Sequence, residues 1–279
     1  MTGRFLVVIF LAAEGLSAQP PTPTYIPQTK FAKGQDVVPS FDGWIRNANG
    51  TFTLVFGYMN RNYEEELAIP AGADNKLEPE PADQGQPTYF LPRRHAWMFR
   101  VTVPADFGNK EVVWTITANG RTEKAYGHLI PDEEILERVI QTRGSLSPGL
   151  DDPNQPPVVS IMSVQTVTAG IPVSLTAAVT DDGLPKPRAS KERPAGDPSK
   201  GQSNTSAARS RLGLNVTWLQ YRGPAKVTFD EVAAIPVVNG QAVTKAHFPQ
   251  PGKYVLRATA NDGELSTAAD VTIDVTATR

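Results

Sequence analysis

The sequence predicts a mainly β protein of two β-sandwich domains, with one helix after the first. Three observations lead to this prediction. Apolar residues recur at every second position in many short runs, which is the period of a half-buried strand. Asn49-Gly50 and Asn119-Gly120 adjoin such runs, and Asn-Gly is the strongest short signal for a hairpin turn. The chain also holds 25 prolines and 22 glycines in 279 residues, which suits short strands joined by turns.

The first eighteen residues differ from the rest of the chain. Arg4 precedes an apolar run from Phe5 to Ala13, and small residues end at Ala18. This is the pattern of a secretory signal peptide, and the apolar run is far shorter than the roughly 20 residues needed to cross a bilayer as a helix. An uncleaved anchor or a buried N-terminal helix is the alternative. We expect residues 1–18 to be a signal peptide, the protein to be exported to the periplasm or the extracellular space, and the mature chain to hold no transmembrane segment.

The amino-acid composition limits the expected class of binding partner and the expected kind of host organism. The sequence contains no cysteine, so an exported chain folds on its core alone without disulfides, which favours a bacterial protein. The net charge is −2 at pH 7, and no global excess of basic residues points to a nucleic-acid partner.

Residues 19–30 form a Pro-rich leader, and residues 31–145 are expected to form the first domain. Three alternating runs predict its strands, with the apolar members of each run on one face. These members are Phe52, Leu54, Phe56 and Tyr58 in the first run, His95, Trp97, Phe99, Val101 and Val103 in the second, and Val112, Trp114 and Ile116 in the third.

One helix is predicted over about 131–143. Pro131 stands at a first helical position, acidic residues fill the first turn, and Arg143-Gly144 closes the apolar stripe. Residues 146–156 follow as a linker by composition.

The second domain, residues 157–276, is all β in pattern. Seven candidate strands occupy about 120 residues, as an immunoglobulin-like sandwich requires. Residues 183–213 break this pattern of strands, because they hold seven lysines and arginines against two acidic residues. This composition predicts a disordered basic insert between two strands.

Several stretches of the second domain, in order, resemble the PKD-like and cadherin-like modules of bacterial exported proteins. They are Asn154-Gln155-Pro156-Pro157, the run from Thr166 to Leu175, Asp181-Asp182-Gly183, Val216-Thr217-Trp218, Gly223-Pro224 and the run from Pro251 to Leu265. The resemblance covers about 154–276 and implies an Ig-like β-sandwich that serves as a spacer, an adhesive unit or a carbohydrate-associated accessory. The sequence has Trp218-Leu219-Gln220 in place of the Trp-Asp-Phe-Gly-Asp-Gly stretch of the best-known PKD repeats. The first domain resembles domains of uncharacterised exported bacterial proteins, a resemblance that names no activity.

No catalytic residue is predicted. The absence of cysteine excludes thiol chemistry, and His95, His128 and His247 lack metal-ligand spacing. Glu64 and Glu66 could offer paired carboxylates, but they share one strand face, whereas the carboxylates of a glycosidase come from different elements around a cleft.

Aromatic residues of the first domain are the candidate ligand-binding residues, because aromatic faces stack on sugar rings. The alternating pattern also allows them to be core residues. The five candidates are Trp44, Tyr58, Tyr63, Tyr89 and Trp97.

Calcium is the one cofactor that the sequence suggests, since it takes six to eight hard oxygen ligands. Oxygen-bearing side chains follow two strands whose loops can meet at one end of a sandwich. Asn261-Asp262-Gly263-Glu264 is also a common composition for a tight hairpin turn. The candidate ligands are Asp181, Asp182, Asn261, Asp262 and Glu264.

The sequence thus predicts a non-enzymatic exported binding or adhesion protein of the cell envelope or extracellular space. A polysaccharide or an envelope protein is the expected partner. Two alternatives remain: an accessory protein of a secreted hydrolase or a weak hydrolase, and a purely structural spacer.

Overall fold

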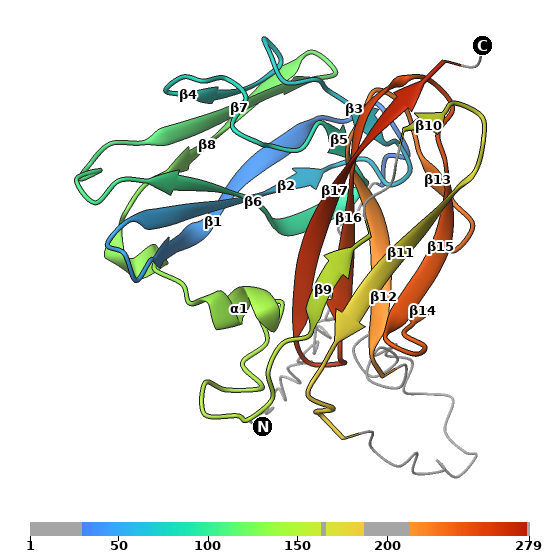
Figure 1. Cartoon of the computed structure of the whole chain (residues 1–279). Coiled ribbons are helices and arrows are strands. Elements are labelled where there is room, and N and C mark those ends of the chain that lie inside the picture. The colour runs from blue at the N-terminus through green and yellow to red at the C-terminus, as the bar shows by residue number, and fades with distance from the viewer. Residues whose placement is uncertain (1–29, 163–165, 187–212, 278–279) are drawn as a thin grey trace, which may run out of the picture. The chain divides into compact units, whose positions relative to one another are not determined.

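A computed structural model describes residues 30–162, 166–186 and 213–277 (Figure 1). The predicted signal peptide, nearly all of the predicted leader and most of the predicted basic insert lie outside these residues. From Phe31 onward the chain forms one compact unit. Its strands gather around two apolar cores, while the domain boundaries given above stay predictions.

Two three-stranded antiparallel sheets make the first sandwich. One sheet has the order β1–β2–β6 and the other β4–β7–β8, and a short pair, β3–β5, lies beside them. Their bounds are β1 Val37–Arg46, β2 Phe52–Asn60, β3 Leu67–Ala68, β4 Asn75–Glu78, β5 Tyr89–Phe90, β6 Arg93–Val103, β7 Val112–Ala118 and β8 Arg121–Gly127.

Aromatic rings fill the space between the two sheets, as the alternating pattern predicts. The ring of Phe56 stacks on Phe99 at 5.1 Å, and Trp114 meets Phe99 edge-on at 4.7 Å. Gly127 lets the sheets approach, because a Cβ atom there would lie 2.5 Å from the ring of Phe56. Such ring pairs add to the free energy gained from burying their area.

Strand β6 departs from the predicted alternation at Trp97. Its pairing with β2 shifts register opposite the stretch between Phe56 and Tyr58, and Trp97 takes a positive φ of 54°. The side chain of Asp42, buried in this bulge, accepts a hydrogen bond from the Trp97 N–H at 2.7 Å and pairs with Arg94 at 2.6 Å. Trp97 therefore leaves the row formed by His95 and Phe99, because a bulge re-aims side chains.

The predicted helix is shorter than expected and divided in two. A 3₁₀ turn spans Pro131–Glu133 and α1 spans Glu137–Gln141. The chain between them is extended, and the N–H of Ile135 donates to the carbonyl of Trp44 at 2.8 Å. This segment adds to the edge of β1, and the bond to the edge strand takes the place of a continuous helix.

Two further sheets make the second sandwich, and all seven predicted strands are present. One sheet has the order β10–β17–β16–β12–β14 and the other β13–β15–β11–β9. Their bounds are β9 Val158–Ile161, β10 Val167–Thr168, β11 Val173–Thr180, β12 Asn215–Arg222, β13 Thr228–Phe229, β14 Ile235–Pro236, β15 Gln241–His247, β16 Gly252–Asn261 and β17 Ser266–Thr276.

This arrangement is immunoglobulin-like. The order β9–β11–β15–β13 is that of the A-B-E-D sheet, and β17–β16–β12 is that of the G-F-C sheet. Trp218 on β12 is buried in the core, as expected for the tryptophan of strand C. One departure concerns β13, which joins the first of these sheets before β14 pairs with β12 in the other.

Strand β12 serves both cores because alternate residues point to opposite faces. Val216 and Trp218 belong to the core of the second sandwich, whereas Tyr221 belongs to the core of the first and Leu219 packs against it. Tyr221 is only 4% exposed and lies at a bulge between β12 and β16.

Polar contacts fix this shared face, which we call the Tyr221 seam. The hydroxyl of Tyr221 donates to the Gly85 carbonyl at 2.6 Å, and the Arg222 guanidinium pairs with Asp83 at 2.6 Å. Arg257 on β16 lies over the Tyr221 ring at 4.3 Å and donates to the Met98 carbonyl at 2.5 Å. Side chains of the second sandwich thus satisfy backbone groups of the first.

Replacing Tyr221 by alanine should destabilise the whole compact unit by about 3–5 kcal/mol, the usual cost of removing a large buried aromatic side chain. Urea denaturation of the protein, followed by intrinsic fluorescence, measures this loss. Tyr126→Ala is the matched control, since Tyr126 on β8 is 47% exposed. Equal effects of the two substitutions would contradict the seam.

Candidate cation site at one end of the second sandwich

Three segments of the second sandwich meet at one end. The first follows β11 at Asp181, the second is the hairpin between β16 and β17 that carries Asp262, and the third enters β9 through Asn154. Thr180 at the end of β11 pairs with Val158 at the start of β9, which brings the first and third segments together. Asn154 lies beside the Asp262 carboxyl, and Asp181 is close enough for the two charges to interact.

Part of each carboxylate is used to hold its own loop. One oxygen of Asp181 accepts the Gly183 N–H at 3.0 Å. Oδ1 of Asp262 accepts the N–H groups of Glu264 and Leu265, each at 2.7 Å. These are the short-range bonds by which aspartate stabilises turns, and they fix the direction in which the second oxygen of each carboxylate points.

The remaining oxygens are buried and make no hydrogen bond of normal geometry, although the Asn154 side chain lies close enough to the Asp262 carboxyl to favour its ionised form. They are Oδ1 of Asp181 and Oδ2 of Asp262, and both side-chain atoms of Asn154 share this condition. Asp262 is 5% exposed and Asn154 is 1% exposed. Burying a polar group without a partner costs free energy, and a charged group costs more. The polar atoms of this cluster are therefore only partly satisfied by hydrogen bonds of normal geometry.

Burial and mutual repulsion act on both carboxyl groups. Burial is the main reason why the pKa of Asp262 is raised above its ordinary value, and the charge of Asp182 adds to it, while the hydrogen bonds from Leu265, Glu264 and Asn154 oppose the rise. Burial likewise raises the pKa of Asp181, with contributions from Asp262 and Asp182. A cation between Asp181 and Asp262 would counter the repulsion and offset part of the burial cost, because an opposite charge favours the ionised form.

The donors suit a hard cation such as Ca²⁺. Two carboxylate oxygens and one amide oxygen are the ligand types that Ca²⁺ takes, with water and backbone carbonyls completing its six to eight positions. Within the described ranges, no three His, Cys, Asp or Glu side chains stand together at metal-binding spacing. The third side-chain donor is therefore the amide of Asn154.

The predicted ligands divide into two groups. Asp181, Asp182 and Asp262 come together, but Asp182 uses its oxygens to accept the N–H groups of Gln155 and Leu184, at 3.0 and 2.9 Å. It holds the segments in place rather than facing the gap.

The other two predicted ligands, Asn261 and Glu264, make hydrogen bonds within the hairpin. Asn261 bonds to the Leu265 carbonyl at 3.0 Å and accepts the Gly263 N–H at 2.9 Å. Glu264 gives its backbone N–H to Asp262. Asn154 was not among the predicted ligands, although its place before the first strand marks the same end of the sandwich.

Most of the aromatic side chains predicted to bind a ligand are instead buried and make contacts within the protein. Trp44, Tyr58 and Tyr89 are each at most 4% exposed. The Trp44 indole donates to the Ile130 carbonyl at 2.8 Å, and the Tyr58 hydroxyl accepts the Leu91 N–H at 3.0 Å. These contacts favour the core interpretation over ligand binding.

Tyr63 and Trp97 are more accessible. Tyr63 is 38% exposed and carries the Arg93 guanidinium over its ring at 4.0 Å. Trp97 is half-buried, and a Cβ atom at Gly144 would lie 3.2 Å from its ring. The two rings have different neighbours, Arg93 for Tyr63 and Gly144 for Trp97.

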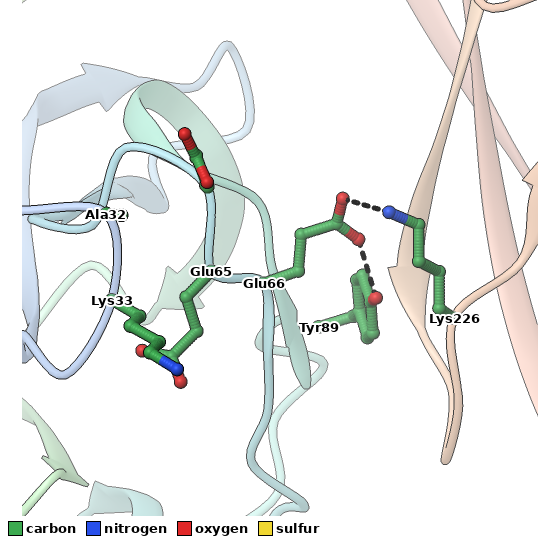
Figure 2. A pocket seen from close by; sticks show the side chains of 7 residues that line it. Ala32, Lys33, Glu65, Glu66, Tyr89 and Lys226 are labelled. Carbon is green, nitrogen blue, oxygen red and sulfur yellow. Dashed lines mark hydrogen bonds and ion pairs between the residues drawn. The ribbon is translucent and has the colours of Figure 1, made fainter.

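The glutamates of residues 64–66 line a hollow of about 430 Å³ together with Ala32, Lys33, Tyr89 and Lys226. Figure 2 shows the Glu66 carboxylate between two partners, the Lys226 ammonium at 2.7 Å and the Tyr89 hydroxyl at 2.6 Å. All three carboxylates come from one segment, and His95 lies elsewhere, stacked on Tyr58 at 5.0 Å. The hollow therefore lacks two carboxylates converging from different elements.

No family model matches this sequence. No curated protein matches it either. Among solved structures, the D00–D0 domain of intimin has 12% identity and a TM-score of 0.28, covering 86% of this chain and all of that one. A conjugative transposon lipoprotein from Bacteroides eggerthii has 14% identity and a TM-score of 0.26, covering 42% of this chain and 96% of its own. Domains 4 and 5 of the S-layer protein SbsC have 8% identity and a TM-score of 0.25, covering 60% and 65%. At these identities and TM-scores, the similarity to these structures implies no function for this protein.

None of the helices in the described residues is both long enough and apolar enough to span a membrane.

Replacing Asp262 by asparagine tests the burial of its unpartnered oxygen, because asparagine keeps the Oδ1 acceptor and removes the charge. A raised pKa means that the folded state binds the proton more tightly, so stability falls as pH rises above the ordinary value of 3.8. In EDTA, wild type should therefore lose stability relative to Asp262→Asn as pH rises from the ordinary value of 3.8 through the raised pKa of the folded state. At pH 7 the variant should be at least as stable as wild type.

Chemical denaturation at a series of pH values measures this difference. Asp274→Asn is the control, because its carboxylate is 68% exposed beside Lys253. A loss of stability in Asp262→Asn at neutral pH without cation would show that the carboxylate is already satisfied within the protein.

Proposed function

We propose that this protein is a non-enzymatic, exported binding protein of the cell envelope, whose PKD- or cadherin-like second sandwich binds Ca²⁺. The observation that carries the cation proposal is the set of buried, unpartnered atoms on Asp181, Asp262 and Asn154. Each comes from a different segment, so one ion would join all three. Export and the envelope location rest on the N-terminal signal-peptide pattern and the absence of cysteine.

The role of the ion would be structural. Both carboxylates are held by turn bonds, Asp262 and Asn154 are buried and Asp181 is half-buried, which suits a permanently bound ion more than an open catalytic centre. The ion would fix the entry of the chain into the second sandwich. A fixed entry suits a protein that displays a binding surface outside the cell, where Ca²⁺ is abundant and the chain has no disulfides to hold it.

Fewer observations bear on the class of molecule that the protein binds than on the cation. Carbohydrate binding by aromatic faces would need exposed rings, and three of the five predicted aromatics are buried. A partner protein of the envelope is therefore the ligand class we favour. The hydrolase alternative would need a second carboxylate opposite Glu66, and its side-chain partners are Tyr89 and Lys226 instead.

Calcium should raise the thermal midpoint of the mature chain, because a ligand that binds only the native state stabilises it. At a free concentration about one hundred times Kd the gain is about 2.7 kcal/mol. Differential scanning calorimetry with Ca²⁺, Mg²⁺ or EDTA measures this gain, and Mg²⁺ should give less because it demands a tighter octahedral shell.

The variants Asp181→Asn and Asp262→Asn should lose the calcium-dependent increment while they remain folded in EDTA. Asp274→Asn, whose carboxylate lies on the same strand as the hairpin but away from the cluster, should keep it. An identical midpoint in Ca²⁺ and EDTA for the wild-type chain would remove the proposed cation.

A further inference from the structure

Helix α1 contacts the third segment of the cation site through Arg138. Its guanidinium donates to three backbone carbonyls, those of Gly149, Asp152 and Asn154. The distances from Nη2 are 3.1, 3.4 and 3.2 Å, and Nη1 adds a bond of 3.3 Å to the Asn154 carbonyl. Arg138 thus holds Asn154, the residue with the buried side-chain amide, through the backbone carbonyl of Asn154.

The same segment is held from the other side as well. The Asn154 N–H donates to the Asp152 carboxylate at 2.9 Å, and the next N–H, that of Gln155, donates to Asp182 at 3.0 Å. Asp182 follows β11, so the segment spans from α1 to the end of that strand. Arg138 is the contact that comes from outside the second sandwich.

Helix α1 also contacts the hairpin that carries Asp262. The hydroxyl of Ser266 donates to the Gln141 carbonyl at 3.1 Å, and Arg143 donates to the same hydroxyl at 3.3 Å. Ser266 pairs with Asn261 to close the hairpin. In Figure 1, α1 lies next to the start of β17, where this hairpin ends.

We propose that α1 is the brace of the cation site, with Arg138 as its main positioning residue. The proposal rests on the cation function given above. Through Arg138 the brace holds the Asn154 segment, and through Ser266 it holds the Asp262 hairpin, so two of the three segments are set by residues that follow the first sandwich. Calcium affinity is thereby coupled to the polypeptide that leaves the first sandwich.

The physical reason is preorganisation. A segment already in place loses little conformational freedom when the ion binds, whereas a loose segment must be ordered at the cost of affinity. Partners that orient metal ligands typically contribute about 10–100-fold to metal affinity. Arginine suits the task because its planar fork reaches several carbonyls at once, which a lysine ammonium does not.

Isothermal titration of the full mature chain with CaCl₂ tests the brace. Arg138→Met should weaken calcium binding by about 10–100-fold, and Arg138→Lys should recover only part of it. Arg100→Met is the matched control, because Arg100 pairs with Glu137 on the same helix at 2.7 Å but touches no linker carbonyl. Its calcium affinity should equal that of wild type.

The thermal midpoint separates positioning from a general loss of stability. Arg138→Met should lose most of the midpoint increase that calcium gives at a fixed concentration, whereas a merely structural role would lower the midpoints with and without calcium equally. If Arg138→Met does not fold, Ser266→Ala tests the other contact by removing one hydroxyl, with about three- to tenfold weaker binding expected.

The outcomes distinguish the two proposals. A wild-type chain that binds no Ca²⁺ overturns the proposed function. A wild-type chain that binds Ca²⁺ with the same affinity as Arg138→Met and Ser266→Ala overturns the brace and leaves the cation site standing.

Discussion

Strand β12 is the element on which the rest of the structure depends, because each of its faces belongs to a different core. Trp218 fills the second sandwich, and Tyr221, three positions later, closes the first. Arg257 stacks on Tyr221 and satisfies a carbonyl of β6, and its charge is compensated by Asp270 at 2.7 Å. Two sandwiches joined through a shared core residue form one compact unit, unlike modules joined only by a linker.

The candidate cation site lies at a second contact, separate from the Tyr221 seam. The polypeptide leaves the first sandwich through α1 and passes Asn154 before it enters β9 at Val158, while the Tyr221 seam joins the two sandwiches elsewhere. The chain is thus closed into a loop between two contacts. An ion bound by Asp181, Asp262 and Asn154 would tighten the second of these contacts. Such an ion would also neutralise carboxylate oxygens that make no hydrogen bond of normal geometry within the protein.

Local pattern predicted most of the fold and part of the site. Period-two alternation located the seven strands of the second sandwich, and the turn composition of residues 261–264 located its last hairpin. The convergence of Asp181 with Asp262 also followed from the sandwich topology. Asn154 was missed because its role depends on burial between two loops, which no spacing reveals. The broken helix and the displaced Trp97 depend on contacts with β1 and Asp42, far away in sequence. Leu219 and Tyr221, apolar on the outward face of a central strand, were a usable sign of the seam.

Hydrogen exchange of the protein, read by mass spectrometry with and without Ca²⁺, tests the central claim most directly. A cation that joins the three segments should slow exchange of the backbone amides around Asn154, Asp181 and Asp262, because ordered loops open less often. Protection should extend to α1 and leave the exposed strand β8 unchanged. Exchange rates that are identical with and without calcium in all three segments would contradict the account.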